Sequence, residues 1–149
     1  MLTKAPKYIK EPDSLQCGQA VLAMLTDKTV DEIIKLTSVT KETKLRDMFF
    51  CLEACDIVFS RERKQVFSKT ELPKIALLSL ETPRCWHWSL YFKGRFFDPE
   101  HGESTDFPEA NRKYFWEIFD LPSAKLYLKC QITAKLKASA VIFAFSIVF

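Results

Sequence analysis

The feature that most constrains the fold is a change in the spacing of apolar residues halfway along the chain. In residues 41–54, apolar side chains recur at i, i+3, i+4 and i+7, the spacing of one helix face. Residues 85–98 instead alternate as strands do, on either side of a turn at Lys93-Gly94. Because helices come first and strands follow, we expect an α+β fold with N-terminal helices packed on a C-terminal antiparallel β-sheet. A chain of 149 residues suits one core, so we expect a single domain over residues 1–149.

Three helices are predicted in the first half of the chain. Asp13 and Ser14 are typical residues to precede a helix, and this first helix should end near Asp27. Thr29 and Glu32, three residues apart, form the sequence signature of a capping box at the start of the second helix. The third helix is the amphipathic stretch described above.

The second half contains further segments with strand-like composition. Residues 75–80 indicate a buried strand and residues 57–59 a short one. We expect another strand at 126–132, and a buried strand in the apolar run 138–149, where β-branched and aromatic residues favour it. A tail anchor is the alternative for that run, but a bilayer span needs about 20 residues, so no membrane association is expected. Residues 107–119 fit either a helix or an aromatic-rich loop.

Cys17 is the candidate nucleophile. Its position after Asp13 and Ser14 places it in the first turn of the first helix. Free backbone N–H groups and the positive end of the helix dipole lie there, and both favour a thiolate over a thiol. Gly18 adds no side chain that could block the sulfur. A cysteine at a helix start can also be an inert small hydrophobe, so a catalytic interpretation requires a base elsewhere in the chain.

The hairpin over residues 85–98 supplies that base. With a two-residue turn at Lys93-Gly94, side-chain alternation places His87 and Asp98 on one face of the two strands, as diagonal neighbours. Trp86 and Trp88 fall on the opposite face, which we expect to be the core. A shift of one residue in register would put His87 and Asp98 on opposite faces.

Cys17, His87 and Asp98 together are the components of thiol nucleophilic catalysis. Asp98 would hold one nitrogen of the imidazole and leave the other as a base for the thiol. The alternatives are structural: His87 could be a satisfied core histidine, and Asp98 could simply open a turn before Pro99.

Two short stretches resemble a known family. Residues 16–24 are similar to the Cys-Gly-x-Ala-x-x-x-Met signature of the bacteriocin-processing (double-glycine leader) peptidases of bacteria and their stand-alone relatives, which are papain-like cysteine peptidases. His87-Trp88-Ser89-Leu90 and Phe97-Asp98-Pro99 are similar to that family's His-aromatic strand and its following Asp-Pro. The resemblance covers roughly residues 8–102. It implies a papain-like fold, with Cys17 as nucleophile, His87 as base and Asp98 as the residue that orients the base.

One position departs from the family pattern. The family has a glutamine six residues before the cysteine, whose amide donates to the oxyanion, and this chain has Glu11 there. An ionised carboxylate cannot donate and would oppose the developing charge, and losing such a donor costs about a hundred- to a thousandfold in rate. Glu11 is therefore protonated in its site, or another donor replaces it, or the enzyme is slow or inactive on peptides. Gln16 is the nearest candidate replacement, and the backbone N–H of Cys17 can also serve.

Composition limits the partners, the cellular compartment and the cofactors that we expect. The net charge is +3 with scattered Lys and Arg, which gives no basic block for a nucleic-acid partner. The five cysteines, an odd number behind an N-terminus without an apolar signal core, indicate reduced thiols in the cytoplasm, with export by another route as the alternative. The spacing of Cys51, Cys55 and Cys85 lacks the paired pattern of a structural zinc site, so no metal or other cofactor is expected. The sequence leaves the oligomeric state open.

The leading interpretation of function is a cysteine peptidase or related thiol hydrolase that cleaves a peptide or protein amide. The same three residues would also serve a protein-glutamine deamidase or an acyl transferase. A catalytically silent module that binds a peptide in the cleft is the alternative from another class, and Glu11 is its main support.

Overall fold

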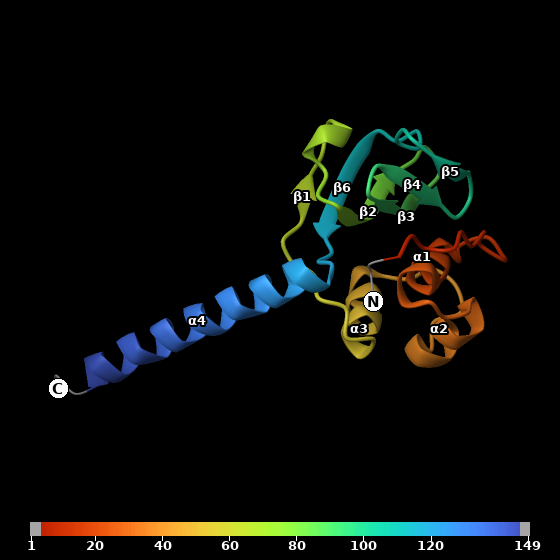
Figure 1. The fold of residues 1–149 in the computed structure, drawn as a ribbon. Coiled ribbons are helices and arrows are strands. Elements are labelled where there is room, and N and C mark those ends of the chain that lie inside the picture. Colours follow the sequence, from red (N-terminus) through yellow and green to blue (C-terminus); the bar gives the residue numbers. More distant parts are fainter. Residues whose placement is uncertain (1–3, 147–149) are drawn as a thin grey trace.

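The computed structural model describes residues 4–146, without the side chains of 121–124 and 140–146, and shows an α+β architecture (Figure 1). Three short helices lie on one side of a twisted antiparallel sheet, and a long fourth helix leaves the body at the C-terminal end. The helices are α1 (Cys17–Thr26), α2 (Val30–Thr37), α3 (Leu45–Ala54) and α4 (Leu121–Ser146).

The three predicted N-terminal helices are present, with a later start for two of them. α2 has the predicted capping box: the Thr29 hydroxyl accepts from the Glu32 N–H at 3.2 Å, and the Glu32 carboxylate accepts from the Thr29 N–H at 2.7 Å. α3 begins at Leu45 rather than near residue 41. α1 begins at Cys17 itself, because the chain first makes a turn at Leu15, where φ is 70°.

In the part of the chain that is described, the sheet has six strands in the order β1-β6-β2-β3-β4-β5, and every neighbouring pair is antiparallel. β2 and β3 form its centre. The strands are β1 (Lys64–Gln65), β2 (Ile75–Glu81), β3 (Trp86–Phe92), β4 (Arg95–Asp98), β5 (Gly102–Ser104) and β6 (Arg112–Glu117).

The β3–β4 hairpin has the predicted register. Leu90 pairs with Phe97, and Phe92 pairs with Arg95. Lys93 and Gly94 form the two-residue turn with φ values of 44° and 96°, the left-handed geometry that matches the twist of the flanking strands. This register puts His87 and Asp98 on the same face of the hairpin.

Both faces of the sheet carry buried apolar clusters. On the helix side, Leu77, Leu90 and Phe97 pack against α1, whose residues from Gly18 to Leu25 are all buried. On the other side, Leu78, Phe96 and Phe115 form a second cluster that loops cover. Since α1 also packs on β3 and β4, the core fixes the start of this helix relative to the hairpin.

Trp86 does not lie in the core, contrary to the expectation from strand alternation. It is 45% exposed, and its ring packs against Tyr114 at 5.9 Å between centroids and under the Arg112 guanidinium at 5.6 Å. Trp86 is the first residue of β3, so it lies beyond the part of the strand that α1 covers. Side-chain alternation predicts which face of the sheet a residue lies on, but it does not predict how much of the strand the helices cover.

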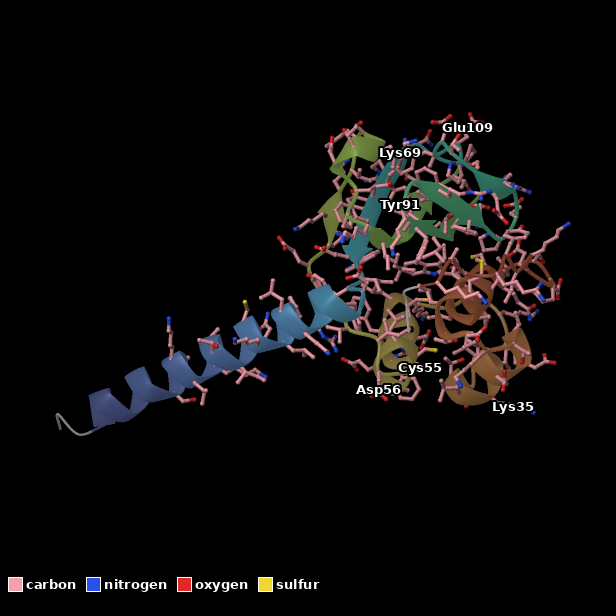
Figure 2. The ribbon with its side chains drawn as sticks, in the orientation of Figure 1. Lys35, Cys55, Asp56, Lys69, Tyr91 and Glu109 are labelled. Atoms are coloured by element: carbon pink, nitrogen blue, oxygen red, sulfur yellow. The ribbon has the colours of Figure 1, made fainter. Side chains whose placement is uncertain are left out.

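The prediction of C-terminal strands at 126–132 and 138–149 is wrong. Residues 121–146 form the single helix α4, which projects away from the body, and residues 147–149 lie outside the described residues (Figures 1 and 2). Leu, Lys and Ala between the β-branched residues are strong helix formers, and Leu126, Ile132 and Leu136 are exposed rather than buried. No helix among the described residues combines the length and the apolar content needed to cross a membrane.

Two further segments also differ from expectation. Residues 107–119 contain strand β6 instead of a helix or an irregular loop. Residues 57–59 form only one isolated bridge, between Phe59 and Ile118.

Candidate active site

Cys17 occupies the first position of α1, is half-buried, and lines a cleft of about 330 Å³. His87 lines the same cleft from β3, and Trp86, Trp88 and Leu15 form much of its apolar wall. The structure therefore brings the sulfur and the imidazole of two distant segments into one cavity.

Gly18 explains how α1 comes so close to the sheet. A Cβ atom at this position would lie 1.7 Å from Thr43 Oγ1 and 3.1 Å from Trp88 Cδ1. Thr43 is itself held on β3, because the Trp88 indole N–H donates to its carbonyl oxygen at 3.1 Å. Only glycine fits this contact, so its role is the packing of the helix start as well as access to the sulfur.

His87 and Asp98 form a buried pair. His87 Nε2 donates to the Asp98 carboxylate and lies 3.0 Å from each of its oxygens. The two residues are 4% and 1% exposed, respectively. Asp98 Oδ1 also accepts from the backbone N–H groups of Glu100 and His101, both at 3.0 Å. Asp98 thus has a fixed position, and it holds one nitrogen of His87 while leaving the other free for chemistry.

The charges of this pair are strongly coupled. Burial alone would lower the pKa of His87, but hydrogen bonds and charge interactions with Asp98 and Cys17 outweigh it and raise the pKa to about 10. Burial would raise the pKa of Asp98, but the hydrogen bond and charge of His87, with the hydrogen bonds to His101, hold it below its usual value. The site therefore favours an imidazolium between a carboxylate on one side and the cysteine sulfur on the other.

Glu11 lies in the same cleft as Cys17 and His87. Its backbone N–H donates to the Pro99 carbonyl at 3.0 Å, which fixes it next to the residue that follows Asp98. Burial raises the pKa of the Glu11 carboxyl, and the carboxylates of Glu100, Asp98 and Asp13 act in the same direction, while His87 opposes them. The pKa of Glu11 therefore lies above its ordinary value, in the direction that a hydrogen-bond donor at this position would need.

Gln16 does not take part in the cleft. Its side-chain amide donates to the Thr40 carbonyl at 3.0 Å, and it is not one of the residues that line the cavity. The turn at Leu15 explains this placement, because it sends the Gln16 side chain toward the loop before α3.

Three residues of the site are not predicted by the sequence patterns described above. Tyr8 donates through its hydroxyl to the Asp98 carbonyl at 2.9 Å, and His101 Nδ1 lies 3.0 Å from Asp98 Oδ1. Glu100 lies beside His87 and pairs with Arg84 at 2.6 Å. An aspartate followed three residues later by histidine is a local signal for such a contact, whereas nothing in the sequence connects Tyr8 to the hairpin.

Cys85 and Cys51 are placed differently from Cys17. Cys85 is exposed and lines the cleft, whereas Cys51 is buried in the core. Burial, together with the charge and hydrogen bond of Cys55, raises the pKa of the Cys51 thiol to about 12. These positions leave Cys17 as the cysteine that shares a cavity and an interaction with His87.

Comparisons with protein-family models, with curated proteins and with solved structures find no match for this chain.

Proposed function

We propose that the protein is a thiol hydrolase that cleaves a peptide or protein amide, with Cys17 as nucleophile, His87 as base and Asp98 as orienting residue. One observation carries the proposal: a buried His87–Asp98 pair shares its cleft with a cysteine that begins a helix. The imidazolium and the N–H groups at the helix start would together stabilise a thiolate.

The reaction follows from the positions of these groups. The Cys17 thiolate attacks the amide carbonyl, and the backbone N–H of Cys17 is available to the oxyanion that forms. The His87 imidazolium gives its proton to the departing amine, which leaves a thioester on Cys17. His87, now neutral, takes a proton from water, which attacks the thioester and frees the acid and the thiolate.

The family we propose is the papain-like cysteine peptidases, with the bacterial leader peptidases as the specific resemblance. The support is the Cys-Gly motif at the start of a helix that packs on an antiparallel sheet, with histidine and Asp-Pro on one hairpin. Five unpaired cysteines suit a reducing compartment, so we propose that the enzyme works in the cytoplasm.

The cleft suits an extended peptide with an apolar side chain, because Trp86, Trp88 and Leu15 line it. Deamidation of a protein glutamine or acyl transfer would use the same triad with a different amide or a different acceptor. A silent peptide-binding module is the second candidate, and the carboxyl of Glu11 in the cleft favours it.

The test compares the alkylation of individual cysteines by iodoacetamide at pH 6, read by peptide mass spectrometry. An ordinary thiol is only about 0.3% ionised at this pH, so a sulfur paired with His87 should react up to about a hundredfold faster. Cys85 is the matched control because it is exposed and lines the same cleft. We expect fast labelling of Cys17, slow labelling of Cys85, and loss of the fast reaction in His87→Ala.

Hydrolysis of a mixed peptide library then separates the candidates. Cys17→Ala should abolish product formation and Cys85→Ala should retain it. Release of ammonia without chain cleavage would identify a deamidase. Equal alkylation rates at Cys17 and Cys85 would remove the hydrolase proposal, and tight peptide binding by such an unreactive protein would support the binding module.

A further inference from the structure

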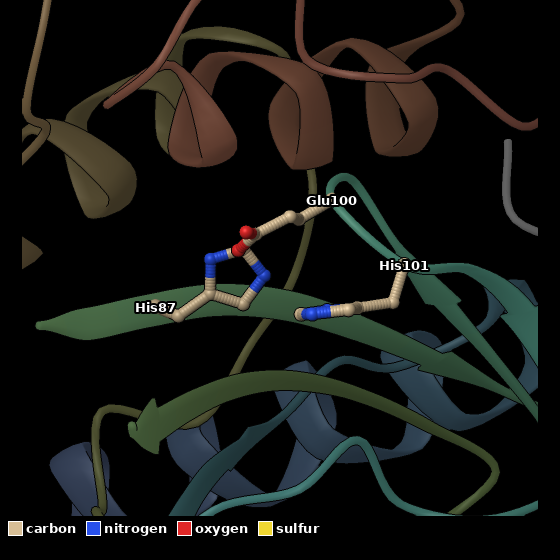
Figure 3. Close-up of side chains that lie close together, drawn as sticks. All are labelled: His87, Glu100 and His101. Atoms are coloured by element: carbon tan, nitrogen blue, oxygen red, sulfur yellow. The ribbon is translucent and has the colours of Figure 1, made fainter. Parts of the chain in front are cut away.

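A second group of side chains meets at the same histidine. One ligand atom each from His87, Glu100 and His101 lie within 4.8 Å of one another (Figure 3). His87 projects from β3, whereas Glu100 and His101 come from the loop between β4 and β5. Two imidazole nitrogens and one carboxylate oxygen are a common set of zinc ligands.

Asp98 interacts with both imidazoles. It lies 3.0 Å from His87 Nε2 and 3.0 Å from His101 Nδ1, so one nitrogen of each ring is engaged by the same buried carboxylate. A carboxylate that accepts from one nitrogen fixes the ring and makes the other nitrogen a better metal ligand. The centroids of the two rings are 6.1 Å apart in an edge-on arrangement.

We propose that His87, Glu100 and His101 bind a zinc ion that switches off the thiol site. The inhibitory effect depends on the hydrolase proposed above, whereas the binding of the metal does not. Both nitrogens of His87 are needed for catalysis, one for Asp98 and the other for the Cys17 sulfur. Zinc bonds to a His87 nitrogen only by displacing the proton which that nitrogen carries in the imidazolium, and this proton passes to solvent. The metal then occupies the nitrogen that thiol chemistry needs, so zinc binding and thiol chemistry exclude each other.

The Glu100 and His101 side chains can adjust to the metal. Zinc bonds to nitrogen are about 2.0 Å long, which requires tetrahedral ligands roughly 3.3 Å apart, so the distances between the three atoms must shorten by up to about 1.5 Å. The His101 side chain is 57% exposed, and Glu100 is held by an exposed ion pair with Arg84 that contributes little to stability. These two residues can therefore move while His87 stays in place. Magnesium, which prefers oxygen ligands and octahedral geometry, should not bind here.

The experiment uses the full chain after treatment with a chelator. Zinc chloride is titrated by isothermal calorimetry, and the alkylation rate of Cys17 is measured with zinc and, separately, with chelator. Each variant is compared with its own rate in chelator, so a change in basal reactivity does not enter the result. Cys85→Ser serves as background, because an exposed thiol at the cleft could bind zinc by itself.

In this background we expect one zinc per chain, with strong slowing of Cys17 alkylation by zinc and none by magnesium. His101→Gln and Glu100→Gln should each weaken zinc affinity by about tenfold or more and remove the slowing at the same zinc concentration. Glu103→Gln, which changes another exposed glutamate of the neighbouring strand, should leave both unchanged. Cys17→Ser should keep the zinc affinity, because the sulfur is not one of the three ligands.

Undiminished zinc affinity in His101→Gln and Glu100→Gln would overturn the proposal, as would loss of binding in Cys17→Ser. Absence of zinc binding in the parent would overturn it too. A protein that binds zinc as expected but whose Cys17 is unreactive in chelator would contradict the hydrolase alone and leave the metal site supported.

Discussion

Replacing Gly18 with alanine tests how Cys17, the proposed nucleophile, is positioned. The added methyl would lie 1.7 Å from Thr43 Oγ1 and 2.9 Å from Thr43 Cβ, well inside van der Waals contact. Thr43 is 4% exposed, and its carbonyl accepts from the Trp88 indole, so its backbone and its Cβ are held in place. Rotating the Thr43 hydroxyl away would still leave the contact with Thr43 Cβ, so the start of α1 must move away from Thr43, by about an ångström where the hydroxyl stays in place.

The expected magnitude comes from two opposing effects. Overpacking of a tight contact costs about 1–3 kcal/mol, while alanine gains up to about 1 kcal/mol over glycine in a helix. The net loss of unfolding free energy should be about 1–2 kcal/mol. A displacement of this size at the nucleophile should also slow Cys17 alkylation and amide hydrolysis by about a hundredfold.

Urea denaturation followed by tryptophan fluorescence measures the stability, and cysteine-resolved mass spectrometry measures the alkylation. Thr43→Ala in the same chain should restore part of both, because it removes the atom in closest contact and Thr43 Oγ1 makes no hydrogen bond that would be lost. Unchanged stability and unchanged Cys17 reactivity in Gly18→Ala would refute the reasoning, and so would a double variant no better than Gly18→Ala alone.

Three further predictions follow from the surroundings of single side chains. Asp98→Asn removes the charge that balances a buried His87, so it should lower the unfolding free energy in urea by about 3–5 kcal/mol and leave only partial hydrolysis; a wild-type midpoint would contradict the pairing. Glu11→Gln places a permanent donor in the cleft and should raise hydrolysis at neutral pH by up to about a hundredfold, whereas a slower enzyme would show that the carboxyl itself is needed. Cys51, with a pKa of about 12, is roughly 0.1% ionised at pH 9, so maleimide should modify it several hundredfold more slowly than Cys85 in the folded protein, and similar rates would contradict its burial.

The parts of the site that the sequence predicted are those set by local rules. The Lys93-Gly94 turn and the alternation beside it determine the register of the hairpin, and the register brings His87 to Asp98. The capping box of α2 is equally local. These features need no knowledge of the rest of the molecule.

The predictions that were wrong concern features that depend on tertiary packing. The exposure of Trp86 depends on how far α1 extends along β3, and the position of the Gln16 amide depends on the turn at Leu15. The apolar residues of α4 suggested buried strands, but strand preference is expressed only where a sheet edge and a covering layer exist. Burial is a property of the whole fold, so single-segment composition could not decide it.

The segment before α1 has a consequence for how the site opens. The Tyr8 hydroxyl and the Glu11 amide both bond to carbonyl groups of the Asp98-Pro99 step, so two strap-like contacts from outside the sheet hold the loop that carries Asp98. Any motion that frees Asp98 must first break these two hydrogen bonds. Exchange of the Glu11 amide hydrogen with solvent therefore reports the opening of the loop that carries Asp98, without a substrate or an inhibitor.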